Sequence, residues 1–96
     1  MMKTHVEKTA QKKVAGEQCF WCFDGQVLAS FLDLKHALSR MSRETYMYHV
    51  TNDKNDFADW VESVLCDKKC ADGLRKIKTQ KSALSCVEKC LGLYAA

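Results

Sequence analysis

The sequence predicts a small α+β domain that is predominantly helical, with an N-terminal β-hairpin followed by four or five short helices. Two short apolar runs flank Asp24-Gly25, and Asp-Gly between such runs is a strong hairpin signal. From Ser30 onward, apolar residues recur at the three- and four-residue spacings of helices. A length of 96 residues with 47% apolar composition suits one domain with one core. We expect the last two helical segments to form an antiparallel helical hairpin.

The chain before the hairpin is polar and has no apolar repeat. We therefore expect residues 1–16 to be a flexible basic tail and residues 17–96 to be a single domain. Strands are expected at about 18–23 and 26–29. The first residues lack the apolar segment of a secretory signal, and no apolar run approaches the roughly 18 to 20 residues that span a bilayer. The expected location is the cytoplasm, with no membrane partner.

Each predicted helix begins at a side chain that can accept a hydrogen bond from the first turn. The capping residues are Ser30, Ser42, one of Asp53, Asn55 and Asp56, then Asp67 and Thr79. The inward stripes that follow are Phe31, Leu34, Leu38 and Met41; Tyr46, Met47 and Val50; Phe57, Trp60, Val61, Val64 and Leu65; Cys70, Ala71 and Leu74; Ala83, Leu84, Val87, Leu91 and Tyr94. Within the fourth segment Gly73 is unfavourable, since glycine in a helix interior costs roughly 1 kcal/mol relative to alanine.

Four short motifs give the chain a family resemblance. They are DGQVL (24–28), YHV (48–50), NDFADW (55–60) and LRKIKT (74–79). On these residues the chain resembles a prokaryotic, largely archaeal and bacterial, family of small domains of unknown function, from about Cys19 to the C-terminus. The resemblance implies a cytoplasmic α+β module and brings no catalytic residues. It does not account for the cysteines of the C-terminal third.

Those cysteines form two C-x3-C pairs, Cys66 with Cys70 and Cys86 with Cys90. Both pairs are symmetric about Lys78. A helical hairpin that turns near Lys78 would place Cys70 opposite Cys86, and Cys66 opposite Cys90. A spacing of four residues also puts the two thiols of each pair on one face of a helix.

Three interpretations of the paired cysteines remain open. Two nested disulfides, Cys66–Cys90 and Cys70–Cys86, are favoured by the symmetry, and closing a loop of about 15 residues could add roughly 3 kcal/mol. A zinc ion held by the same four thiolates is an alternative, although structural zinc sites prefer C-x2-C spacing. Free cysteines that pack as small apolar residues are the third. No other cofactor is expected.

Cys19 and Cys22 form a C-x-x-C within the first predicted strand. Residues three apart in a strand point to opposite faces, which does not suit a shared metal ion or a redox disulfide. A thioredoxin-like motif also requires a strand-to-helix turn that is missing here. We expect one of these cysteines to pack in the core beside Phe20 or Trp21.

The sequence contains no residue set typical of an enzyme, and we expect a non-enzymatic interaction module with an unidentified protein partner. The candidate binding patch is the polar and aromatic neighbourhood of Tyr46, Tyr48, His49, Asn55, Asp56 and Trp60. His49 has two interpretations: a general base held by a carboxylate, or a residue that ties the polar loop to the next helix.

Charge is distributed unevenly along the chain. Residues 1–18 carry four basic and two acidic residues (+2), residues 19–66 four and seven (−3), and residues 67–96 seven and three (+4). The basic candidates for phosphate contacts are Lys68, Lys69, Arg75, Lys76, Lys78 and Lys81. Nucleic-acid binding through the tail and the C-terminal hairpin is therefore an alternative function, against a solvated basic face. A zinc-binding or thiol-redox protein using the C-x3-C pairs is the other alternative.

Overall fold

The structure is a computed structural model that describes residues 13–95, and it confirms a mostly helical α+β fold. A two-stranded antiparallel sheet precedes five α-helices in the described part of the chain. The elements are η1 (Gly16–Gln18), β1 (Phe20–Trp21), β2 (Val27–Leu28), α2 (Phe31–Arg40), α3 (Arg43–His49), α4 (Asp56–Ser63), α5 (Lys68–Arg75) and α6 (Gln80–Ala95). Most of the expected tail, residues 1–12, lies outside the described residues.

The predicted hairpin is present with shorter strands than expected. Phe20 pairs with Leu28 and Trp21 with Val27. Gly25 has a φ of 96°, which glycine adopts without steric cost, and this conformation closes the turn. The ladder is short because the 3-10 turn η1 occupies residues 16–18, before the first strand, and residues 22–26 form the connection.

Side-chain caps begin the helices at the predicted residues. The Ser30 hydroxyl accepts a hydrogen bond from the Asp33 amide (3.1 Å), and the Asp33 carboxylate accepts one from the Ala29 amide (2.9 Å). Among the three candidates for α4, the cap is Asn55, whose side-chain oxygen accepts from the Ala58 amide (3.0 Å). Ser42, Asp67 and Thr79 cap α3, α5 and α6 in the same way.

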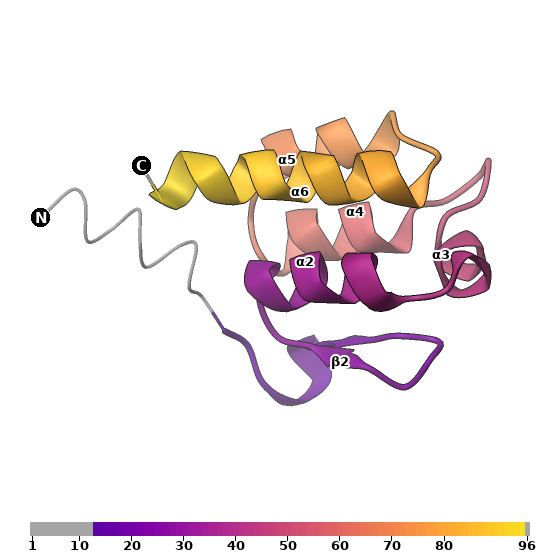
Figure 1. Cartoon of the computed structure of the whole chain (residues 1–96). Helices are drawn as coiled ribbons and strands as arrows, with labels where there is room; N and C mark the ends of the chain where they lie inside the picture. Colours follow the sequence, from indigo (N-terminus) through magenta and orange to yellow (C-terminus); the bar gives the residue numbers. More distant parts are fainter. Residues whose placement is uncertain (1–12, 96) are drawn as a thin grey trace, which may run out of the picture.

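The helices pack side by side above the hairpin, with α6 running along α5 and α2 (Figure 1). Helix α6 contacts α2 and α5, and α5 in turn contacts α4, so the expected hairpin of the last two helices is confirmed. One side chain joins the start of α6 to the end of α2: the Gln80 amide donates to the carbonyls of Leu38 (2.8 Å) and Met41 (2.7 Å). A second joins α4 to α5, since Asn55 donates to the Leu74 carbonyl (3.1 Å).

The core follows the predicted stripes, but Met47 is wrongly assigned, and Val64, Leu84 and Leu91 are only half-buried. Met47 was expected to face inward, but it is 47% exposed. The buried face of α3 carries Thr45, Tyr46 and His49, and at 100° per residue Met47 lies on the other side. Val64 is only half-buried, because α4 ends at Ser63. The Tyr94 side chain lies outside what the structure describes. Across the described helices, no segment combines the length and apolar character needed to cross a membrane.

Candidate metal centre

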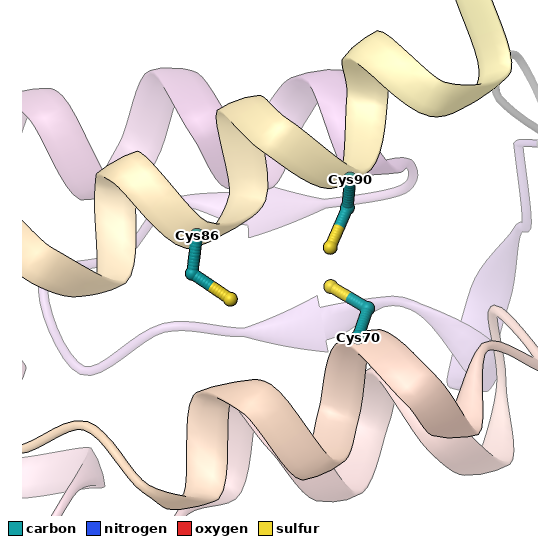
Figure 2. Close-up of side chains that lie close together, drawn as sticks. All are labelled: Cys70, Cys86 and Cys90. Atoms are coloured by element: carbon teal, nitrogen blue, oxygen red, sulfur yellow. The ribbon is translucent and has the colours of Figure 1, made fainter.

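Three of the four C-terminal cysteines meet between α5 and α6. Cys70 projects from α5, and Cys86 and Cys90 project from successive turns of α6 toward it (Figure 2). Their three sulfur atoms all lie within 4.8 Å of one another. The four-residue spacing within α6 puts Cys86 and Cys90 on the same face, as the sequence predicted. We call Cys70, Cys86 and Cys90 the thiol cluster.

Cys66 does not belong to the thiol cluster. The prediction for this residue assumed that Cys66 and Cys70 share one helix face, and that assumption is wrong. Helix α5 begins at Lys68 behind the Asp67 cap, and Cys66 has a left-handed φ of 60° before the helix starts. Cys66 is exposed, and its sulfur donates weakly to the Val64 carbonyl (3.7 Å).

Neither of the two disulfides favoured by the symmetry is formed in the structure, in which no cysteine is bonded to another. Cys70 lies near Cys86, as the mirror symmetry predicted, but Cys90 also joins this group instead of facing Cys66. Figure 2 shows the sulfur atoms of Cys70 and Cys90 pointing toward each other across the gap between the two helices. This facing pair is therefore arranged almost as in a disulfide, but its two sulfur atoms are not bonded.

Gly73 makes room for the thiol cluster. A Cβ atom at this position would lie 3.3 Å from the Cys86 sulfur, closer than most carbon–sulfur packing contacts. Glycine in a helix interior is unfavourable by roughly 1 kcal/mol relative to alanine. The close approach of α5 to Cys86 gives this glycine a physical reason.

The thiol cluster lines an open pocket of about 720 Å³ between α5 and α6. The pocket walls also include Gly73 and the half-buried Ile77. The charged side chains around the pocket are Lys69, Lys81 and Lys89 against the single acid Asp67, and Ser82 and Ser85 complete the lining. The sulfur atoms are thus reachable from solvent through a positively charged rim.

Proximity and burial shift the thiol pKa values in opposite directions. The pKa of Cys70 is raised strongly, first by its hydrogen bond with Cys90 and then by burial. The pKa of Cys86 is raised by burial and by the negative charge on Cys90. The pKa of Cys90 is lowered by the hydrogen bond from Cys70. One thiolate is therefore easy to form, and the second and third are difficult without a cation among them.

A zinc ion fits among these sulfur atoms. Zinc–thiolate bonds are about 2.3 Å long, which places the sulfurs of a tetrahedral site about 3.8 Å apart. The present separations lie within 4.8 Å, so each pair would close by no more than about 1 Å. Three protein ligands leave the fourth position of a tetrahedron free. All three cysteines of the thiol cluster line the pocket.

The second polar neighbourhood surrounds His49 and is filled by internal hydrogen bonds. The Phe23 amide donates to His49 Nε2 (3.0 Å), and His49 Nδ1 lies 3.0 Å from the Asp56 carboxylate. His49 is buried, and Phe20 and Phe57 pack against its ring. Both ring nitrogens are used in tying the hairpin to the start of α4, which matches the interpretation of His49 as a structural tie.

The rest of the candidate binding patch is divided between core and surface. Tyr46 and Asn55 are buried, and Trp60 is buried with its indole N–H donating to the Gln18 carbonyl (2.8 Å). Tyr48 is exposed and stacks on Phe23, with ring centroids 4.3 Å apart. The large exposed apolar side chains on the hairpin and α3 are Trp21, Phe23, Val27, Met47 and Tyr48.

The basic candidates for nucleic-acid contacts do not act as one set. Arg75 pairs with Asp59, Glu62 and Asp72, at 2.7 to 3.1 Å, and Lys68 pairs with Asp72 (2.9 Å). The Lys78 ammonium donates to the Thr51 carbonyl (3.3 Å). Lys69 and Lys81 line the pocket, and Lys76 is exposed at the end of α5.

The N-terminal C-x-x-C also has the packing that the sequence predicted. Cys22 belongs to the hydrophobic core, and Cys19 is half-buried with its thiol directed to the Val14 carbonyl (3.7 Å). Neither residue belongs to the thiol cluster.

Comparison with known proteins adds no family to this geometry. Neither a protein-family model, nor a curated protein, nor a solved structure matches the chain. The prokaryotic family resemblance stays a prediction. What the protein does must be inferred from the thiol cluster and its surroundings.

Of the four C-terminal cysteines that the sequence singles out, three meet in the structure, and the sequence does not predict what surrounds them. The pocket and its rim depend on which faces α5 and α6 present to each other. One signal was available: Gly73 lies three residues after Cys70, which indicates a close approach between the two helices.

Proposed function

We propose that this protein binds a zinc ion through the thiolates of Cys70, Cys86 and Cys90. The observation that carries the proposal is the convergence of three sulfur atoms within 4.8 Å from two different helices. Gly73 supports it, because an unfavourable helix residue stands where a larger side chain would press on the Cys86 sulfur. Thiolates are soft ligands and suit zinc better than magnesium or calcium.

The charge around the cluster favours zinc over copper(I). Three thiolates and Asp67 carry four negative charges, and Lys69, Lys81 and Lys89 carry three positive charges. A divalent ion brings the group to one net positive charge, whereas a monovalent ion leaves it neutral with less attraction for each thiolate. Zinc also tolerates four-coordinate geometry with a non-protein ligand in one position.

A zinc titration of the reduced protein in competition with a chromophoric chelator tests the proposal. We expect one bound zinc per chain, and we expect Cys90→Ser to weaken binding by more than about 100-fold, since even outer-shell substitutions commonly cost 10- to 100-fold. Cys19→Ser is the matched control, because Cys19 lies outside the cluster and a hydroxyl can keep its bond to Val14. Absence of stoichiometric zinc, or equal affinity in both variants, contradicts the proposal.

A disulfide between Cys70 and Cys90 is the second candidate for the same atoms. It is favoured by the hydrogen bond that raises the pKa of Cys70 and lowers that of Cys90, and by their facing sulfur atoms (Figure 2). Intact mass with and without reductant separates the two candidates. A gain of two hydrogens on reduction identifies one disulfide, and an unchanged mass leaves the thiols available for metal.

A surface can also be proposed for the protein partner that the sequence analysis expects. The exposed aromatic pair Phe23 and Tyr48, with Trp21 nearby on the hairpin, is the surface that we propose for a protein partner. Lines broadened at these residues in an NMR titration with a candidate partner would support it. The thiol cluster lies on other elements, so metal binding and partner binding can be tested separately.

A further inference from the structure

We infer that the zinc ion keeps one open coordination position and takes a small organic thiol there, bound as its thiolate. This inference rests on the proposed function and names the class of ligand. It is carried by three observations: three protein sulfurs instead of four, a pocket beside them, and a positive rim around that pocket. Metal sites with three protein ligands and an accessible fourth position are those that bind exogenous molecules.

The fourth position is not supplied by a nearby protein sulfur. Cys66 is the nearest cysteine in sequence, but it is not within the mutual 4.8 Å of the three cluster sulfurs. It stands before the cap of α5 with a left-handed φ of 60°. Asp67 lines the pocket, and its Oδ1 accepts the hydrogen bond from the Cys70 amide (2.9 Å) that begins the helix. Turning this oxygen onto the metal would remove the cap, and no carboxylate oxygen of Asp67 belongs to the group of ligand atoms that converge with the three sulfurs.

The pocket has the size and charge for a small anionic molecule. Its volume of about 720 Å³ lies in the range of ligand-binding cavities. With zinc bound, the lining keeps one net positive charge, which attracts an anionic ligand. Lys81 and Lys89 lie on the pocket rim beside the α6 thiols and would attract it.

The walls and the metal together favour a thiolate over a carboxylate. Ile77, Gly73 and the cysteine side chains form much of the wall, and burying a strongly hydrated carboxylate against them is unfavourable. A thiolate is softer and less strongly hydrated, and it matches the three ligands already present. The bond formed is a metal–sulfur bond, the proton leaves the thiol for solvent, and no electron is transferred.

Cobalt(II) in place of zinc provides the test, because its thiolate charge-transfer and d–d absorption bands report ligand number and geometry. We first expect one equivalent of cobalt(II) to produce these bands in the reduced protein. Adding 3-mercaptopropionate should then shift the bands in a saturable manner, whereas propionate at the same concentration should not. Gel filtration checks that the cobalt stays with the protein.

Two variants sharpen the result. Lys81→Gln should weaken thiol binding by about threefold without changing the starting spectrum, since it removes one rim charge; Lys76→Gln, exposed and outside the pocket, is the matched control. Cys66→Ser should leave the starting spectrum unchanged. If this variant loses charge-transfer intensity, Cys66 is the fourth ligand and the inference is overturned.

The outcomes distinguish a failure of the proposed metal site from a failure of the open coordination position. Absence of cobalt bands contradicts the proposed metal site itself. Cobalt bands that do not respond to 3-mercaptopropionate leave the metal site intact and overturn only the open position. Equal responses to 3-mercaptopropionate and propionate overturn the thiol preference.

Discussion

The neighbourhoods of His49 and of the thiol cluster both contain unusual concentrations of chemically active side chains, but they differ in whether those groups have partners. Around His49, the Phe23 amide and the Asp56 carboxylate occupy both ring nitrogens. In the thiol cluster, three sulfur atoms converge on a pocket, and the groups that surround them are lysines on the rim. The first arrangement is complete in itself, and the second is the one for which we propose a metal ion.

This difference shows how a structural group can be distinguished from a binding group. A buried polar side chain whose donors and acceptors are all used contributes to folding, because losing it leaves its partners unsatisfied. Converging groups that raise one another's pKa are costly to ionise unless a cation joins them. His49 belongs to the first class and the thiol cluster to the second.

The largest expected effect is the pH dependence of zinc affinity. The raised pKa values of Cys70 and Cys86 mean that both thiols hold protons at neutral pH, and zinc must displace them. With at least these two protons released, affinity should rise at least about 100-fold per pH unit between about pH 6 and 8, and isothermal titration in buffers of different ionisation enthalpy measures the proton number. Release of no protons would contradict the thiol assignments.

The stability of the metal-free protein should fall as the pH rises in alkaline solution, whereas the zinc affinity rises with pH. Thiols of the unfolded chain ionise near their ordinary pKa of 9.0, whereas Cys70 and Cys86 keep their protons in the folded state. Their contribution to stability is present below pH 9 and is lost as the pH rises further, partly offset by the lowered pKa of Cys90.

The second prediction concerns the completed neighbourhood. His49→Ala should lower the free energy of unfolding by about 2–4 kcal/mol, because it leaves the Phe23 amide without its acceptor and opens a cavity between Phe20 and Phe57. Urea denaturation measures the loss, and zinc affinity of the folded variant should not change. The control is the adjacent, exposed Tyr48→Ala, which should cost about 1 kcal/mol or less. Similar stability losses in both variants would contradict the structural role of the His49 hydrogen bonds.

The third prediction concerns the packing around the thiol cluster. Gly73→Ala should weaken zinc binding by about tenfold, because the new Cβ would displace the Cys86 sulfur by a few tenths of an ångström. Gly92→Ala is the matched control: Gly92 likewise lies inside a helix, α6, and a Cβ there meets nothing within 4 Å. The control should stabilise the helix by up to about 1 kcal/mol without changing zinc affinity. A competition titration on both variants checks this.

The smallest expected effect comes from an exception inside the core. Tyr46 is 1% exposed, and its hydroxyl has no hydrogen-bond partner among the described residues. Burial also raises its pKa. Tyr46→Phe should therefore raise the free energy of unfolding by about 1 kcal/mol, a shift of about 5 °C in Tm. Tyr48→Phe, with an exposed side chain, should leave Tm unchanged by calorimetry, and destabilisation by Tyr46→Phe would indicate a missing partner.

The sequence was sufficient for the fold because its signals are local. Ser30 and Ser42 cap the helices that they were predicted to cap, and Asp24-Gly25 closes the predicted turn. The strands are shorter than predicted, since a 3-10 turn occupies residues 16–18, and its Gln18 carbonyl accepts a nonlocal hydrogen bond from Trp60 that no local pattern shows. Met47 was placed inward because a seven-residue helix gives too few turns to fix its orientation.

The candidate site was only partly predictable for a related reason. Symmetry about Lys78 correctly placed Cys70 near Cys86, but it treated the residues before Asp67 as helical. The rotation of α6 about its axis decides whether Cys90 meets Cys70 or Cys66, and this rotation is set by contacts with α2 and α5 together. Such nonlocal packing has no simple sequence pattern.

Two side chains, Gln80 and Asn55, join four of the helices into two pairs by hydrogen bonds. Gln80 fastens α6 to α2, and Asn55 fastens α5 to α4. The two helices that carry the thiol cluster therefore belong to different pairs. The sulfur atoms lie at the interface between these pairs. A metal ion bound there would link the two pairs of helices. The pairs would then unfold together when the ion is present and could unfold separately when it is lost.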